Sequence, residues 1–162
     1  MKLKIKDQIP DTDIFQLVDG EPQKSKLREI IGDGKNVLFG LPGAFTSTCS
    51  KLHLPGFVAN ADKIKAKGIE KIFCLSVNDP YVMNGWGEIN NIGDKIKMLS
   101  DPYLLFTKAI GAEVDRNSKG MGIRSNRYLM VIENFTVVNI HVEKETKECG
   151  LTSAENLLNN LL

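Results

Sequence analysis

The chain of 162 residues has only three cysteines, Cys49, Cys74 and Cys149, and no CxxC pair. An odd and small number excludes a complete set of disulfides. The missing CxxC spacing excludes zinc ribbons and thioredoxin-type redox pairs. These absences favour a reducing compartment, with one cysteine as the candidate for a reactive thiol.

Net charge and long apolar runs are also absent. Twenty-one Lys and Arg against 20 Asp and Glu leave a net charge of +1, which argues against a nucleic-acid or anionic-membrane partner held by bulk charge. No run approaches the roughly 18 apolar residues that a membrane span needs, and the start has no signal-peptide core. We expect a soluble, cytoplasmic chain, with a mitochondrial or plastid location open if a leader has been removed.

The composition, 42% hydrophobic and 25% charged, is that of an ordinary soluble domain. No repeat, low-complexity tract or linker interrupts it, so we expect a single domain over 1–162. Alternating strand and helix patterns predict an α/β sandwich with a mixed central sheet. Near the N-terminus, the run 13–18 followed by Asp19-Gly20 predicts a β-hairpin.

Strands are expected at 36–41, 71–77 and 97–99, with an antiparallel pair at 128–132 and 135–142. Short helices are expected at 27–31, 80–89 and 104–110. A longer helix at 48–67 contains Pro55-Gly56, where we expect a kink or break. The C-terminal helix is expected to open with a capping box at Thr152–Glu155.

Cys49 follows a buried strand and falls in the first turn of the next helix. Free backbone N–H groups and the positive end of the helix dipole there favour thiolate over thiol. The other interpretation is a small buried hydrophobe, as most free cysteines are. Thr46 offers a hydroxyl for a small oxygen-bearing ligand, and Pro42 offers a rigid apolar wall without an N–H. Taken alone, Thr46 would be interpreted as a helix cap and Pro42 as a turn residue. The spacing of Pro42, Thr46 and Cys49 together predicts a walled thiolate pocket.

The segment 42–57, PGAFTSTCSKLHLPGF, resembles the active-site signature of the peroxiredoxins, specifically their type II or five-like branch. Similar blocks follow in the same order at 74–83, 100–102 and 122–128. The resemblance implies a thioredoxin-like three-layer α/β/α sandwich and thiol peroxidase activity toward hydrogen peroxide and alkyl hydroperoxides. It implies no cofactor and no metal.

By this resemblance, Cys49 is the peroxidatic cysteine, Thr46 positions the peroxide, and Pro42 shields the sulfur. Arg127 matches the arginine that stabilises the thiolate and the charge developing on the O–O bond, with Arg124 as the alternative. A smaller contribution to the substrate site is expected from three further residues, Phe45, Thr48 and His53. Backbone N–H groups of the turn from Phe45 to Cys49 are expected to complete an anion site. For His53, packing is favoured over general-base duty.

The positions of the other two cysteines bear on the reductant. In animal members of this branch the resolving cysteine follows a Gly-Leu-Thr segment, whereas here Cys149 precedes Gly150-Leu151-Thr152. Cys74 matches the second cysteine of plant members but lies in an apolar strand. We therefore expect a one-cysteine cycle in which glutathione or glutaredoxin reduces the enzyme, with a thioredoxin-dependent two-cysteine cycle through Cys74 or Cys149 as the alternative. The resemblance also implies a homodimer.

Two other hypotheses remain at this point. A general thiol oxidoreductase on the same fold is disfavoured by the missing CxxC pair. A non-catalytic redox-sensing or interaction module would keep the pocket without turnover, and the joint presence of Pro42, Thr46, Cys49 and Arg127 argues against it.

Overall fold

A seven-stranded mixed sheet forms the centre of the molecule in the computed structural model, which describes residues 1–162. Its strand order is β2-β1-β5-β4-β3-β8-β9. β3, β4 and β5 are mutually parallel, and the remaining pairs are antiparallel. The strands are β1 (Asp13–Val18), β2 (Glu21–Lys26), β3 (Lys35–Gly40), β4 (Ile72–Ser76), β5 (Lys97–Ser100), β8 (Tyr128–Glu133) and β9 (Thr136–Val142).

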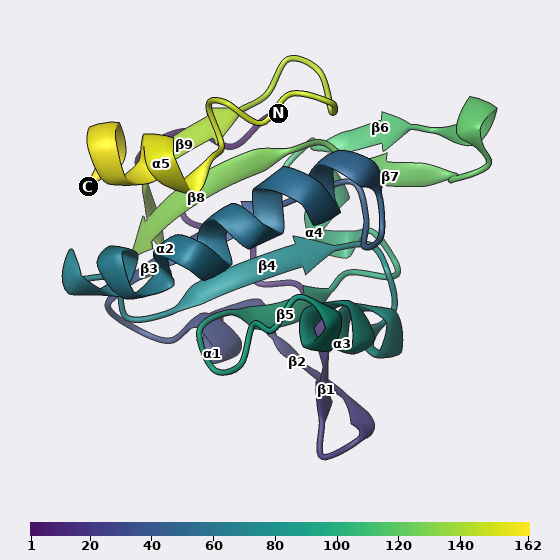
Figure 1. Ribbon diagram of the computed structural model, residues 1–162, viewed down its shortest axis with the longest axis horizontal. Helices are drawn as coiled ribbons and strands as arrows, with labels where there is room; N and C mark the ends of the chain where they lie inside the picture. The colour runs from purple at the N-terminus through teal and green to yellow at the C-terminus, as the bar shows by residue number, and fades with distance from the viewer.

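Helices cover both faces of this sheet and give the molecule three layers (Figure 1). One face packs against α2, α3 and α5, and the other packs against α1 and α4. No helix is long and apolar enough to cross a bilayer. The helical elements are α1 (Leu27–Ile31), the π-helical turn η1 (Cys49–His53), α2 (Leu54–Ala66), α3 (Pro80–Ile89), α4 (Leu105–Ala109), α5 (Ala154–Asn156) and the π-helical turn η3 (Leu157–Leu161).

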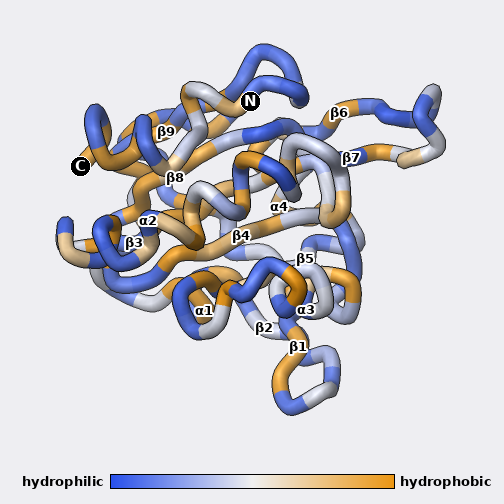
Figure 2. Tube along the Cα trace, in the orientation of Figure 1, coloured by the Kyte–Doolittle hydropathy of each residue, from blue (hydrophilic) through white to orange (hydrophobic).

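The two hydrophobic cores follow from side-chain alternation along the central strands. In β3, Val37 and Phe39 enter the core under α2, whereas Leu38 enters the opposite core. Because both faces are covered, β4 is hydrophobic along its length, which Figure 2 shows as a continuous orange stretch. The α/β sandwich, its mixed sheet and its N-terminal β-hairpin are therefore as predicted.

The sequence predicts a kink or a break at Pro55-Gly56, and the structure shows no break there. The chain stays helical from Ser47 to Ala66, and the irregularity takes the form of the π-helical turn before Pro55. The N–H of Leu54 donates to Cys49 O, five residues back. Pro55 is the second residue of α2 and has no N–H to donate, and the wider turn directly before it accommodates the proline without interrupting the helix.

The predicted capping box is wrong in detail. Ser153, one residue later than expected, caps α5, and its Oγ accepts from the N–H of Asn156 at 3.1 Å. The hydroxyl of Thr152 donates to the carboxylate of Glu143 instead, at 2.9 Å. Thr152 and Ser153 could each cap this helix. Because the hydroxyl of Thr152 binds the buried Glu143, Ser153 serves as the cap.

Sequence patterns missed one substructure, a two-stranded arm formed by β6 (Glu113–Asp115) and β7 (Ile123–Ser125). A 3₁₀ turn, η2 (Asn117–Lys119), lies near its tip. In Figure 1 the arm projects from the upper right of the molecule. Its strands have three residues each and little buried surface, so alternation over so short a span gives no usable signal.

Candidate functional site

Cys49 is placed by the tight loop that leaves β3. Phe45 adopts a left-handed conformation with φ of 62°, and the N–H of Ala44 donates to Asn78 Oδ1 at 2.9 Å. A Cβ at Gly43 would lie 2.7 Å from Arg124 Nη1, so a side chain here would displace the guanidinium of that flexible arginine. The loop delivers Cys49 to the π-helical turn with its side chain fully buried.

Arg127, immediately before β8, directs its cation onto this sulfur. Its Nη2 donates to Cys49 Sγ at 3.3 Å and to the carbonyl of Thr146 at 2.9 Å. Its Nη1 donates to His53 Nδ1 at 2.8 Å. The residue is only 1% exposed, so the guanidinium interacts with the sulfur in a largely dry environment, where electrostatic attraction is strong.

His53 is held in one tautomer. A carbonyl can only accept a hydrogen bond, so Nε2 carries the proton that it donates to Thr152 O at 2.9 Å, and Nδ1 accepts from Arg127. Burial, reinforced by the charge of Arg127, lowers the pKa of His53 to about 3. The ring is therefore neutral near pH 7, and its one lone pair is occupied by the arginine. This arrangement suits orientation of Arg127 and does not suit general-base catalysis.

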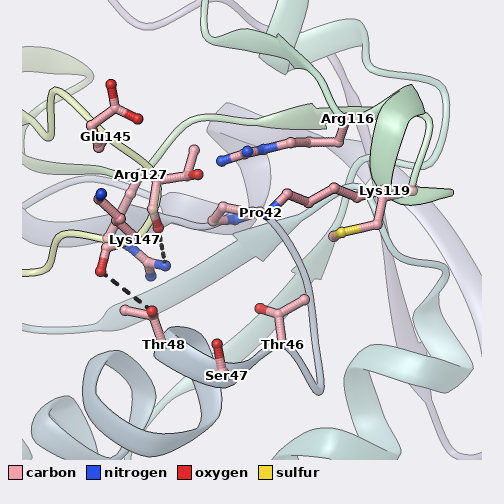
Figure 3. Close-up of a pocket in the computed structure, with 11 residues that line it drawn as sticks. Pro42, Thr46, Ser47, Thr48, Arg116, Lys119, Arg127, Glu145 and Lys147 are labelled. Carbon is pink, nitrogen blue, oxygen red and sulfur yellow. Dashed lines mark hydrogen bonds between the residues drawn. The ribbon is translucent and has the colours of Figure 1, made fainter.

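A cavity of about 430 Å³ opens beside the turn that carries Cys49, and Thr46, Ser47 and Thr48 line it. Pro42, Thr46, Thr48 and Arg127 contribute to its lining, and Figure 3 shows these side chains around one hollow. Cys49 itself is covered, and Arg127 is the residue that reaches both the cavity and the sulfur. The hydroxyl of Thr46 donates to Gly43 O at 2.8 Å, which leaves its lone pairs as acceptors.

The structure does not bring every expected residue to this site. The side chain of Phe45 is 58% exposed and takes no part in the cavity lining. Thr48 lines the cavity, and its hydroxyl donates to Lys147 O at 3.3 Å. Arg124, the alternative arginine, donates to Met121 O and at 3.4 Å to Pro42 O, so it braces the loop and leaves the sulfur to Arg127.

The other two cysteines differ in setting. Cys74 is fully buried in β4, and burial raises the pKa of its thiol well above the ordinary value. Cys149 is half-buried in the segment between β9 and α5, and burial again raises the pKa of its thiol. All three cysteines are unpaired.

Sequence reasoning missed the contacts by which the segment 143–152 supports the site, through Thr146 to Arg127 and through Thr152 to His53. Glu143 is 3% exposed, and its Oε1 accepts from both the N–H and the hydroxyl of Thr152, each at 2.9 Å. Thr152 in turn holds His53 through its carbonyl. A connected series of contacts therefore runs from Glu143 through Thr152, His53 and Arg127 to Cys49. The nearest sequence signal was Thr152, which resembled a helix cap.

Comparison with known proteins supports the same assignment. The Redoxin family model matches residues 4–158. Peroxiredoxin-2D of Arabidopsis thaliana is 39% identical over 160 residues, covering 98% of each chain. The chloroplastic peroxiredoxin-2E-2 of Oryza sativa subsp. japonica is 40% identical, over 98% of this chain and 72% of that protein. The crystal structure of reduced Prx3 from Vibrio vulnificus in complex with H₂O₂ matches with a TM-score of 0.92 and 40% identity, covering 99% of each chain. The chain therefore belongs to the redoxin family as a peroxiredoxin, a thiol peroxidase with a thioredoxin-like fold.

Proposed function

We propose that the protein reduces hydrogen peroxide and alkyl hydroperoxides through a one-cysteine cycle at Cys49. The Cys49 sulfur attacks the terminal peroxide oxygen, the O–O bond breaks, and the leaving oxygen takes a proton to depart as water or alcohol. Cys49 becomes a sulfenic acid. The observation that carries the proposal is the contact of Arg127 Nη2 with Cys49 Sγ at 3.3 Å.

The surrounding residues have distinct roles in this proposal. Arg127 stabilises the thiolate and the negative charge that develops on the departing oxygen. The hydroxyl of Thr46, whose proton is donated to Gly43 O, accepts the hydrogen bond of the incoming hydroperoxide. Pro42 forms the apolar wall that keeps water from the sulfur. The hydrogen peroxide bound to the Vibrio vulnificus relative supports this small substrate.

The settings of Cys74 and Cys149 support a one-cysteine cycle. Cys74 lies in the middle of a covered strand, so a bridge to Cys49 would require local unfolding to reach disulfide geometry. Cys149 lies in a segment fixed by the hydrogen bonds that Thr146 and Lys147 accept. An external thiol, glutathione with or without glutaredoxin, then reduces the sulfenic acid. Thioredoxin acting on a Cys49–Cys149 disulfide is the second candidate.

The deciding experiment is steady-state peroxide consumption by the wild type and three single Cys→Ser variants, with glutathione plus glutaredoxin or with thioredoxin. Cys49→Ser should abolish turnover with either reductant. Cys74→Ser and Cys149→Ser should leave glutathione-dependent turnover within about twofold of the wild type. If Cys149→Ser is as damaging as Cys49→Ser, the one-cysteine cycle is wrong. Absence of sulfenic acid at Cys49 after peroxide treatment would refute the peroxidase site.

We also propose that the protein forms a homodimer. Three apolar side chains, Phe45, Leu52 and Tyr81, are each more than half exposed on segments that adjoin the Cys49 turn. Large exposed apolar side chains of this kind are typical of association surfaces. Sedimentation of the wild type and of Phe45→Ser would test this. The proposed location is the cytoplasm, and the chloroplastic rice relative supports a plastid as the alternative.

A further inference from the structure

The cavity that Arg127 lines carries more positive charge than a neutral peroxide needs. Arg116 and Lys119 enter it from the β6–β7 arm, and Lys147 enters from the segment between β9 and α5. Figure 3 shows the two arm side chains extending toward Pro42, with Lys147 and Glu145 on the far side. Arg127 adds a fourth cation, and the only acidic lining residue is Glu145.

We call Arg116, Lys119 and Lys147 the rim cations, and none of the three forms an ion pair with an acidic side chain. The ion pairs of the structure lie elsewhere, at Lys24–Asp13, Lys26–Asp13 and Lys95–Asp62. The whole chain has a net charge of only +1, so the concentration of cations is local to this cavity. Arg116 is half-buried, and Lys119 and Lys147 are exposed at the mouth of this cavity. Unpaired charges of one sign around a concave site raise the local concentration of oppositely charged ligands.

A hydroperoxide cannot be the ligand for this rim. It is small and neutral, and the hydroxyl of Thr46 with the guanidinium of Arg127 already provides for it. The cavity, at about 430 Å³, lies in the range of about 300–1,000 Å³ that accommodates drug-sized molecules. The other molecule that must enter after peroxide has left is the reductant, whose sulfur has to reach Cys49.

We propose that Arg116, Lys119 and Lys147 bind the carboxylates of a low-molecular-weight anionic thiol of the glutathione class and hold its sulfur over Cys49. The inference rests on the proposed function. Arg116 suits a carboxylate because its planar guanidinium can donate two parallel hydrogen bonds. Glu145 suits the ammonium group of the same peptide. Three rim cations and one rim acid thus match a tripeptide that carries two carboxylates and one ammonium.

The chemical step at this site is a condensation followed by an exchange. The thiol sulfur attacks the sulfenic sulfur of Cys49, an S–S bond forms, and the S–O bond breaks, with hydroxide leaving as water after it takes the thiol proton. A second thiolate, from glutathione or glutaredoxin, then attacks the bound thiol's sulfur and releases Cys49 as thiolate. Two electrons pass from two thiols to Cys49, so the cycle balances.

The test measures mixed-disulfide formation on Cys49 after oxidation by one equivalent of hydrogen peroxide. Quenched samples are analysed by mass spectrometry with glutathione, neutral 2-mercaptoethanol or cationic cysteamine. For each thiol the rate of the Arg116→Glu/Lys119→Glu variant is divided by that of the wild type, so that intrinsic thiol reactivity cancels. We expect a fall of at least about tenfold with glutathione, a change within about twofold with 2-mercaptoethanol, and a rise with cysteamine.

Lys147→Glu, on the opposite side of the cavity, should give the same pattern independently of the arm. The matched control is Lys63→Glu/Lys67→Glu, which makes the same charge change at the far end of α2 and should alter none of the three rates. Added salt should slow the wild type with glutathione and leave 2-mercaptoethanol unaffected.

Equal ratios of variant rate to wild-type rate for the three thiols would overturn the rim proposal without contradicting the proposed peroxidase function. So would reduction of the sulfenic acid by thioredoxin with no glutathione adduct on Cys49. Failure of the proposed function is a different observation, namely no sulfenic acid on Cys49 of the wild type after peroxide treatment.

Discussion

At the scale of single residues, Arg127 makes contacts that no other side chain could make together. One planar group reaches Cys49 Sγ, His53 Nδ1 and Thr146 O in different directions. A lysine ammonium at this position keeps the charge but lacks the fixed fork of donors. We predict that Arg127→Met slows sulfenic acid formation by about 10²–10³-fold, the range for losing one preorganised donor to a developing anion. Arg127→Lys should recover only part of this loss.

Stopped-flow measurement of the peroxide step, at equal Cys49 thiol content, checks the prediction. The matched control is Arg28→Met, because Arg28 also donates to a backbone carbonyl, that of Ile9, but contacts no residue of the site. That control should react at the wild-type rate even if it is less stable. A rate for Arg127→Met within about twofold of the wild type would remove the arginine from the mechanism.

Part of this constellation could be predicted from the sequence and part could not. The spacing of Pro42, Thr46 and Cys49 is local, so the printed residues already place them around one turn. The bond of His53 to Thr152 spans 99 residues, and no local pattern reports such a contact. The side chain of Phe45 was expected near the substrate, but the left-handed backbone at that position leaves it exposed.

At the scale of elements, the segment from β9 to α5 acts as a support for the catalytic helix. Glu143 is a buried carboxylate whose Oε1 accepts both hydrogen bonds from Thr152. Thr152→Val keeps the shape but removes the hydroxyl, so one charge-assisted bond is lost in a buried site. We predict a loss of about 1–3 kcal/mol in the free energy of unfolding. The peroxide step should slow as well, because the hydroxyl bond to Glu143 fixes the backbone whose carbonyl, at Thr152, holds His53, and His53 orients Arg127.

Thr152→Ser is the matched variant, because it restores the hydroxyl at the cost of one methyl group. Urea unfolding and the stopped-flow peroxide rate should both return toward the wild type. If Thr152→Val loses stability but reacts at the wild-type rate, the segment supports the fold alone and does not position Arg127.

The elements that could be predicted were those with a strong internal pattern. β3 and β4 are continuous apolar runs, and the Asp79 carboxylate caps α3 by accepting from Val82 N at 3.0 Å. The β6–β7 arm has no such pattern, since its short strands pair with each other outside the main sheet. The π-helical turn was missed because proline predicts a kink or break, whereas here a wider turn, closed by the bond from Leu54 N–H to Cys49 O, precedes Pro55 and the helix continues.

At the scale of the whole molecule, the net charge is near zero, but positive charge is concentrated in one place. Cations gather around one cavity, and the buried His53, which contacts Arg127, makes stability depend on pH. The only histidines are His53 and His141. His141 is half-buried on β9, whereas His53 lies in the core beside Phe39 and Phe57. The surroundings of His53 lower its pKa to about 3.

This shift predicts a loss of stability in acid. The pKa of His53 in the native state is below its ordinary value of 6.5, so the unfolded chain binds the proton first as pH falls. The contribution is therefore complete above pH 6.5 and is lost progressively between 6.5 and about 3. Between about pH 7 and about pH 5 it amounts to about 2 kcal/mol. Urea unfolding at these two pH values should show this difference in the wild type and in His141→Gln, but a smaller one in His53→Gln. NMR titration of the wild type provides a measurement that needs no variant, since the His53 ring should show no inflection near its ordinary pKa. An ordinary titration there, or an equal acid sensitivity in His53→Gln, would show that the ring is not held neutral by burial and Arg127.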